Sequence, residues 1–183
     1  FKKDIQPMQI AVQYINGLYT SVYTPENCIG HIIYVHGGPG IHCASFEKLI
    51  ETNKDYQNSS MGWICYDQRG CGRSELNEEL THQNNISDLF SLYSHLVDKN
   101  FDIKAIFGHS YGALLAKEAH TLIKENISLI LAGMNNNLTS PRNRSFLMDC
   151  IILKQENYSA YESVLKEIAE CDTIGLTSGA SAP

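Results

Sequence analysis

Long apolar runs and an excess of positive charge are both missing from this sequence of 183 residues. No run of about 18 or more apolar residues occurs, so we expect no transmembrane helix, and no apolar stretch follows the first residues as it would in a signal peptide. The formal net charge is −6, which argues against the broad basic surface of a nucleic-acid-binding protein. We therefore expect neither a membrane nor a nucleic acid among its partners.

Metal and cofactor motifs are missing as well. The six cysteines have neither the spacing of a zinc site nor that of a short disulfide scaffold. Gly70 and Gly72 belong to no G-x-G-x-x-G motif, and no Walker lysine is present. We therefore predict no metal, no cofactor and mostly free thiols, which favour a cytoplasmic location. Six Asn-x-Ser/Thr sequons leave a secreted form open; they begin at Asn58, Asn85, Asn126, Asn137, Asn143 and Asn157.

The distribution of apolar residues predicts one α/β domain. The composition, 43% hydrophobic and 19% charged, is that of a globular protein. Short runs that are apolar throughout are typical of strands covered on both faces of a parallel sheet. They occupy residues 32–35, 63–66, 103–107 and 128–132. Helical periodicity at residues 86–97 and 113–123 alternates with these runs, which predicts a doubly wound, mostly parallel sheet.

The two ends of the chain differ from this central pattern. Residues 8–24 alternate loosely around Asn16-Gly17, the strongest short signal for a hairpin, so we predict two antiparallel strands there. Residues 135–137 and 140–143 form a polar linker, and the segments 146–154 and 158–169 have helical patterns. We therefore place the domain core at residues 1–134 and a linker with a helical appendage at residues 135–183.

A G-x-S-x-G pattern occupies residues 108–112, Gly-His-Ser-Tyr-Gly. The strand predicted before it and the helix predicted after it are the setting in which this pattern forms a nucleophile elbow. Such a turn presents the serine hydroxyl above a helix N-terminus, whose N–H groups stabilise a developing oxyanion. We predict that Ser110 is the catalytic nucleophile. The alternative is a glycine-containing turn with an incidental serine.

A glycine-rich loop, His-Gly-Gly-Pro-Gly at residues 36–40, follows an earlier predicted strand. Stabilising an oxyanion takes two converging donors. We assign the backbone N–H of Tyr111 as one donor and that of Gly38 as the other, with Gly37 as the second choice. A tight turn selected only for its shape is the alternative. The residues expected to line the substrate pocket are His36, Pro39, Gly40 and His109. The residue before an elbow nucleophile, here His109, ordinarily points away from such a pocket.

A third motif, Asp-Gln-Arg-Gly-Cys-Gly-Arg-Ser, occupies residues 67–74 and follows the second apolar run. Its glycines suit turns. Asp67 and Arg69 are close enough in sequence to form a partly buried ion pair that would hold the loop near the pocket. We interpret this motif as structural rather than catalytic.

These three motifs, in this order and spacing, resemble the proline iminopeptidase group of α/β-hydrolases. The similarity covers roughly residues 30–132 and, more weakly, the hairpin. It implies an α/β-hydrolase fold, a serine nucleophile without metal, and release of an N-terminal residue, often proline, from a short peptide. It also implies a helical cap, of which residues 140–170 would be the start. Related enzymes tend to have tryptophan after the nucleophile, where this chain has Tyr111.

The resemblance further implies a triad in the order serine, acid, histidine, but no strand–loop–acid and strand–loop–histidine follow Ser110. His120 falls inside a predicted helix, and His42 is a weak substitute for the base. We therefore interpret the chain as the N-terminal part of such a hydrolase, completed by a continuation or a complementing chain. An esterase of the same fold, or a non-catalytic fragment or binding module, stays open. An incomplete sheet also predicts a partner or self-association at an exposed apolar edge.

Overall fold

The computed structural model describes residues 8–38, 40–76 and 79–134. In these residues a six-stranded sheet has the strand order β1-β2-β4-β3-β5-β6. The predicted linker and cap, residues 135–183, lie outside the described residues, and so does Pro39. The strands are β1 (Gln9–Ile15), β2 (Leu18–Thr24), β3 (His31–Val35), β4 (Gly62–Tyr66), β5 (Ile103–His109) and β6 (Ser128–Ala132). The helices are α1 (Ala44–Thr52), α2 (Lys54–Gln57), α3 (His82–Asp98) and α4 (Tyr111–His120).

The predicted hairpin is present at the start of the sheet. Asn16 and Gly17 have φ values of 52° and 79°, the two positive angles that a type I′ turn requires. This turn places Ile15 opposite Leu18 and pairs β1 with β2 along their whole length. Strand β2 then runs antiparallel to β4, whereas β4, β3, β5 and β6 run parallel to one another. The sheet is therefore mostly parallel with an antiparallel edge, as predicted.

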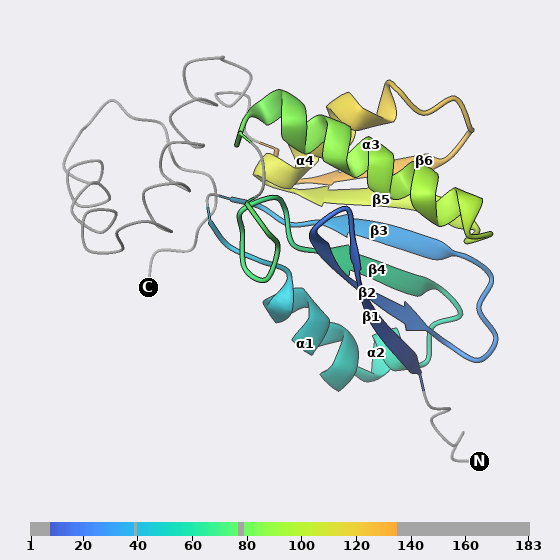
Figure 1. The fold of residues 1–183 in the computed structure, drawn as a ribbon. Coiled ribbons are helices and arrows are strands. Elements are labelled where there is room, and N and C mark those ends of the chain that lie inside the picture. Colours follow the sequence, from blue (N-terminus) through green and yellow to red (C-terminus); the bar gives the residue numbers. More distant parts are fainter. Residues whose placement is uncertain (1–7, 39, 77–78, 135–183) are drawn as a thin grey trace, which may run out of the picture.

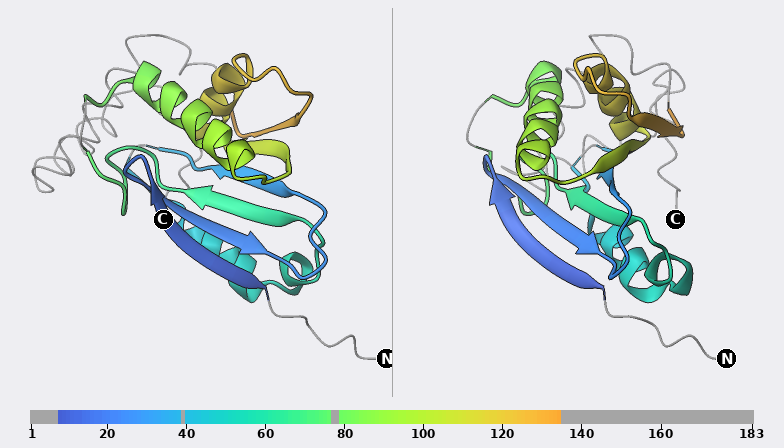
Figure 2. Two further views of the ribbon diagram at one scale, coloured as in Figure 1. Left: turned by 45° about the vertical axis from the view of Figure 1, so that its right-hand side comes forward. Right: turned by 90° about the vertical axis from the view of Figure 1, so that its right-hand side faces the viewer.

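Helices cover both faces of the sheet, with α3 and α4 on one side and α1 and α2 on the other (Figures 1 and 2). The larger apolar core lies under α3 and α4 and includes Ile33, Leu89 and Leu115, all fully buried. A smaller cluster lies under α1 and includes Phe46 and Cys65. Because both faces are covered, the central strands need apolar side chains on both sides. This requirement explains why they appear in the sequence as unbroken apolar runs.

The helix boundaries differ in part from the sequence pattern. Helix α3 begins at His82, earlier than its first apolar position, because Thr81 Oγ1 caps it by accepting a hydrogen bond from Asn84 N at 3.0 Å. The pattern does not predict α1 and α2. Helix α1 buries Phe46 and Ile50, which are one turn apart, but its nine residues are too few for a clear period. No helix of the described residues combines the length and the apolar character needed to cross a bilayer.

Strand β6 is the outer strand of the described sheet beyond β5. Ile130 and Leu131 on this strand are 44% and 38% exposed. An exposed apolar edge strand is a template for pairing with another strand. The expected partner or self-association at this edge stays a prediction.

Helix α3 contributes several buried side chains to the larger core. Leu89→Ala removes a fully buried side chain from the larger core, so we expect the free energy of unfolding to fall by about 2–5 kcal/mol. Val97→Ala on the exposed side of the same helix is the matched control, and we expect a change within about 0.5 kcal/mol. Urea unfolding followed by circular dichroism measures both, and equal losses would contradict this account of the core.

Candidate active site

Ser110 lies at the sharp turn between β5 and α4. Its backbone has φ 54° and ψ −119°, a combination that an L-residue adopts only under constraint from its surroundings. The turn is held on both sides, because Ser110 N donates to Ala132 O of β6 at 2.8 Å and Ala113 N donates to Ser110 O at 3.0 Å. Ser110 is 5% exposed. The backbone strain predicted for a nucleophile elbow is thus present at this residue.

Two glycines allow the strand and the helix to approach each other at this turn. A Cβ atom on Gly112 would lie 2.2 Å from Val35 O and 2.3 Å from His36 O. A Cβ atom on Gly108 would lie 2.4 Å from Gly112 O. These separations are far inside van der Waals contact, so neither position can hold a side chain without movement of the backbone. The start of α4 is therefore packed directly on the end of β3.

The glycine-rich loop after β3 packs on the same turn. A Cβ atom on Gly37 would lie 3.1 Å from Ser110 Cβ, and one on Gly38 would lie 3.3 Å from Tyr111 Cδ1. Tyr111 is the first residue of α4, where backbone N–H groups have no partner within the helix and the macrodipole is positive. The four backbone positions assigned to the nucleophile and the oxyanion donors are therefore brought together.

Both ring nitrogens of His36, at the start of this loop, bind backbone groups. The ring is buried, and its Nε2 accepts a hydrogen bond from Gln68 N at 2.9 Å. The proton of the neutral ring is therefore on Nδ1, which donates to Gly37 O at 2.5 Å. Burial lowers the pKa of His36 from 6.5 to about 4. His36 is thus a neutral structural histidine at physiological pH, with its ring turned into the interior.

Asp67, directly after β4, binds Cys43, which follows the glycine-rich loop and precedes α1. Its carboxylate accepts hydrogen bonds from Cys43 N and Cys43 Sγ, both at 2.9 Å, and from Arg73 Nε at 2.8 Å. Burial alone would raise the pKa of Asp67, but the hydrogen bonds from Arg73 and Cys43 outweigh it and lower the pKa to about 2. The charged carboxylate therefore ties the start of α1 to the turn after β4.

The predicted ion pair between Asp67 and Arg69 is wrong. Asp67 pairs with Arg73, and Arg69 Nε donates to Asp88 of α3 at 2.8 Å. Gly72 is the physical reason, because at φ 52° it turns the chain back over Asp67, where a Cβ atom would lie 2.5 Å from the carboxylate. This turn delivers Arg73 rather than Arg69 to Asp67.

Arg73 connects this anchor to two further elements. Its Nη1 atom lies 2.9 Å from Oε2 of Glu47 in α1, and its guanidinium carbon lies 3.5 Å from the centre of the Tyr19 ring of β2. Glu47 in turn accepts a hydrogen bond from Ser21 of β2. Buried charges are tolerated only when they are paired in this way. The network therefore fixes the loops at the carboxyl edge of the sheet to one another.

Comparison with known proteins finds relatives of similar sequence and similar fold. No family model matches the chain. A protein of Leptolyngbya boryana named "Probable proline iminopeptidase" is 33% identical over 138 residues, which are 71% of this chain. The chain spans about 40% of that relative. A proline iminopeptidase-related protein from Thermus thermophilus superposes with a TM-score of 0.56 at 19% identity, covering 90% of this chain and 66% of that one.

The chain is proline iminopeptidase-like and has the α/β-hydrolase fold. A carboxyl esterase from Bacillus coagulans has the same fold, with a TM-score of 0.59 at 21% identity, covering 85% of this chain and 52% of that one. The predicted fold class and the resemblance are both confirmed. The roles assigned to individual residues of this α/β-hydrolase fold stay predictions.

Of the other residues assigned to the pocket, His109 lies beside the glycine-rich loop, and Pro39 is outside the described residues. The ring of His109 is next to the glycine-rich loop, because its Nδ1 would lie 3.4 Å from a Cβ atom on Gly37. Gly40 has φ 68° and is partly exposed. Within the described ranges, no hydrogen bond joins Ser110 Oγ to a histidine. His120 is bonded to Ile127 O at 3.0 Å, and His42 accepts from Ala44 N at 3.3 Å.

Sequence reasoning misses two contributors to this α/β-hydrolase site. Cys43 is a hydrogen-bond donor to Asp67, and its contact with Cys65 together with burial holds the pKa of the Cys43 thiol well above its usual range. No local pattern reveals a pairing 24 residues apart. His82 contacts Tyr111. The signal for this contact is chemical, because a buried tyrosine hydroxyl requires a partner.

The structure describes some of the cysteines and sequons singled out in the sequence. Cys28, Cys43 and Cys65 are free thiols, as predicted, whereas Cys150 and Cys171 lie outside the described residues. Among the sequons, Asn85 is buried in α3 and Asn58 and Asn126 are exposed. The others lie outside the described residues. In the described part of the chain, no group of three or more His, Cys, Asp or Glu side chains is arranged to hold a metal ion.

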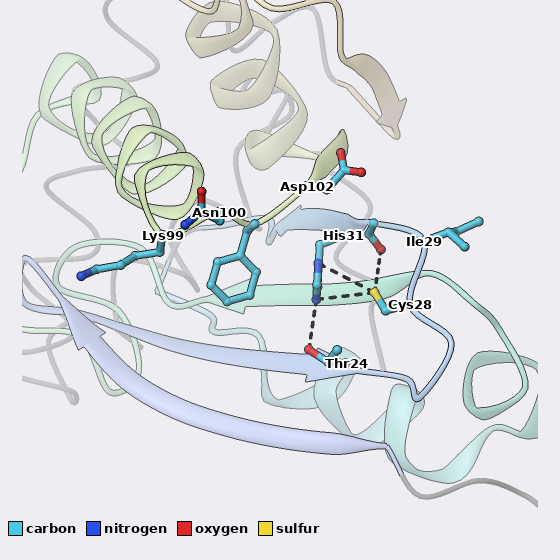
Figure 3. A pocket seen from close by; sticks show the side chains of 9 residues that line it. Thr24, Cys28, Ile29, His31, Lys99, Asn100 and Asp102 are labelled. Carbon is cyan, nitrogen blue, oxygen red and sulfur yellow. Dashed lines mark hydrogen bonds between the residues drawn. The ribbon is translucent and has the colours of Figure 1, made fainter.

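A separate pocket of about 440 Å³ opens at the opposite edge of the sheet (Figure 3). It is lined by the end of β2, the start of β3 and the segment between α3 and β5. His31 Nε2 lies 3.0 Å from Thr24 Oγ1 there, and Cys28 Sγ lies nearby at 3.8 Å. Ligands of open α/β sheets bind at the carboxyl ends of the strands. This pocket lies at the amino ends, so it is not part of the candidate active site.

The close approach at Gly112 is open to a direct test. We expect Gly112→Ala to lower the free energy of unfolding by at least about 3 kcal/mol, because the methyl group would overlap two backbone carbonyl groups. Gly133→Ala is the control. It has a positive φ of 61°, but its Cβ atom would meet nothing nearer than 3.7 Å, so only backbone strain of about 1 kcal/mol is expected. Thermal and urea unfolding measure both variants, and equal losses would refute the packing argument.

The buried neutral state of His36 predicts a specific pH dependence. The unfolded chain takes up a proton near pH 6.5 and the folded chain only near pH 4, so acid favours unfolding in this window. We expect the wild type to lose about 3 kcal/mol between these values from this residue. His36→Gln should lack this part of the loss. Urea unfolding at several pH values measures it, and identical pH profiles for the two proteins would contradict the assignment.

Proposed function

We propose that Ser110 is the nucleophile of a serine hydrolase that acts by acyl transfer. The observation that carries the proposal is the strained backbone of Ser110 at φ 54° and ψ −119°, with Gly37 and Gly38 packed against Ser110 and Tyr111. A strained turn persists only when its surroundings impose it, and such strain concentrates at active sites. The strand before it and the helix after it are the elements that a nucleophile elbow requires.

The proposed reaction has two halves. Ser110 Oγ forms a bond to the carbonyl carbon of the substrate, and its proton passes to a general base. The negative charge that develops on the carbonyl oxygen is stabilised by the backbone N–H groups of Gly38 and Tyr111. The bond to the leaving group then breaks, and the leaving group takes the proton. Water attacks the acyl-enzyme and restores the serine hydroxyl.

The general base belongs, in this proposal, to a complementing segment or chain. All seven histidines of the sequence lie in the described ranges, and none of them bonds to Ser110 Oγ there. A serine without a base is a poor nucleophile at neutral pH. Catalysis therefore requires a histidine brought to the elbow from elsewhere, at the edge of the sheet beyond β6.

The proposed substrates are short peptides with an N-terminal proline-type residue. The name and 33% identity of the Leptolyngbya boryana relative support this choice, together with the three motifs at the carboxyl edge of the sheet. The substrate scissile carbonyl would lie over the turn, between Ser110 and the glycine-rich loop. The fold by itself supports many acyl substrates, so a substrate assay is needed to identify the leaving group.

The test is active-site labelling of the native protein, purified with any chain that accompanies it. We expect a fluorophosphonate probe to label Ser110, and Ser110→Ala to abolish labelling and lower kcat by about 10⁴-fold or more. Ser94→Ala is the matched control, because this hydroxyl is bonded to Phe90 O within α3. It should label at the wild-type rate.

A substrate panel separates the remaining outcomes. Faster turnover of prolyl naphthylamide than of alanyl naphthylamide or short-chain nitrophenyl esters supports the aminopeptidase. Turnover of the esters alone would replace it with an esterase of the same fold. Absence of labelling at Ser110 in the native assembly would overturn the hydrolase proposal and leave a binding module.

A further inference from the structure

The side chain of Tyr111, the residue after the candidate nucleophile, is buried. Tyr111 is 1% exposed, and its hydroxyl oxygen lies 2.9 Å from Nδ1 of His82, the first residue of α3. A phenol in the interior needs such a partner, because an unpaired hydroxyl costs about 1–3 kcal/mol. The contact therefore joins the first residue of α4 to the first residue of α3.

His82 is held in turn by an acidic side chain. Its Nε2 lies 3.2 Å from Oε2 of Glu118, which stands about two helical turns after Tyr111 on α4. The side chain of His82 is 11% exposed and that of Glu118 is 36% exposed. With the ring neutral and its proton on Nε2, the Tyr111 hydroxyl donates to Nδ1 and Nε2–H donates to the Glu118 carboxylate. The two contacts then fix the orientation of the ring from both sides.

The ring of Tyr111 also touches the other assigned donor. A Cβ atom on Gly38 would lie 3.3 Å from Tyr111 Cδ1, so the phenol ring lies between the glycine-rich loop and His82. A shift of this ring is therefore expected to change the spacing between Gly38 and the start of α4. Two oxyanion donors must converge on one point, and a displacement of about 1 Å can cost about 10²-fold in rate.

We propose that His82 and Glu118 are positioning residues that act through Tyr111. They hold its ring against Gly38, so that the backbone N–H groups of Gly38 and Tyr111 converge above Ser110. This inference rests on the proposed function and deepens it. Because this role involves no contact with the substrate, we expect the effect to fall on the transition state rather than on substrate binding.

The kinetic test uses substitutions in the native protein. We expect Tyr111→Phe and His82→Leu each to lower kcat and the rate of fluorophosphonate labelling about tenfold, with KM changed less than about twofold. His82→Gln should keep labelling within about threefold of the wild type, because its amide both accepts from the phenol and donates to Glu118. The double variant His82→Leu with Tyr111→Phe should equal either single variant, since both remove the same hydrogen bond.

The matched control is His95→Leu, a partly buried histidine on the same helix. It should leave kcat and labelling unchanged. Should His82→Leu fail to fold, the comparison of Tyr111→Phe with His82→Gln still decides the proposal. Labelling of His82→Gln as slow as that of Tyr111→Phe, or wild-type labelling of Tyr111→Phe, would overturn the positioning role.

A second measurement does not depend on activity. Imidazole ¹⁵N NMR at about pH 8, above the ordinary histidine pKa of about 6.5, should show His82 with its proton on Nε2 and a hydrogen-bonded Nδ1. The Nδ1 signal should shift in Tyr111→Phe. If wild-type Ser110 does not react, the proposed function fails while the NMR still reports the contact. If Ser110 reacts and the Nδ1 signal ignores Tyr111→Phe, the inference alone fails.

Discussion

The contact between α4 and the end of β3 is the constraint on which the candidate site depends. The carbonyl oxygens of Val35 and His36 occupy the space that a side chain on Gly112 would need. Helix α4 can therefore begin only if the chain turns within one residue after β5, and Ser110 takes the positive φ that this turn requires. The same contact brings the glycine-rich loop onto Ser110 and Tyr111. The strain at the serine and the nearness of the assigned donors thus have one cause.

Two kinds of support surround this contact. The apolar core under α3 and α4 holds both helices against the sheet. The polar network of Asp67, Cys43, Arg73 and Glu47 holds the loops at the carboxyl edge of the sheet. Burying charged groups is unfavourable, and here several hydrogen bonds offset that cost for Asp67. His36 is buried in its neutral state, so it avoids the cost. Contacts of both kinds therefore hold the loops at the carboxyl edge of the sheet.

Local patterns predicted most of the fold but only part of the site. The hairpin at Asn16-Gly17, the central strands and α4 follow from turn chemistry and from apolar runs, which depend on neighbours in sequence. Helix α1 was missed, because its apolar positions are few and its buried Glu47 is held by Arg73 and Ser21, which are distant in sequence. The pairing of Asp67 with Arg69 was wrong because proximity in sequence does not say which way a side chain points after a turn at Gly72.

By itself the amino-acid sequence determined the class of fold and the residue that stands at the elbow, because periodicity and glycine placement act over a few residues. Tertiary structure alone decided which groups surround that residue. Cys43 reaches Asp67 across 24 positions and His82 reaches Tyr111 across 29, and no local preference encodes such distances. Those pairs form because packing of the helices and loops on the sheet buries polar groups, and a buried polar group is stable only with a hydrogen-bonding partner.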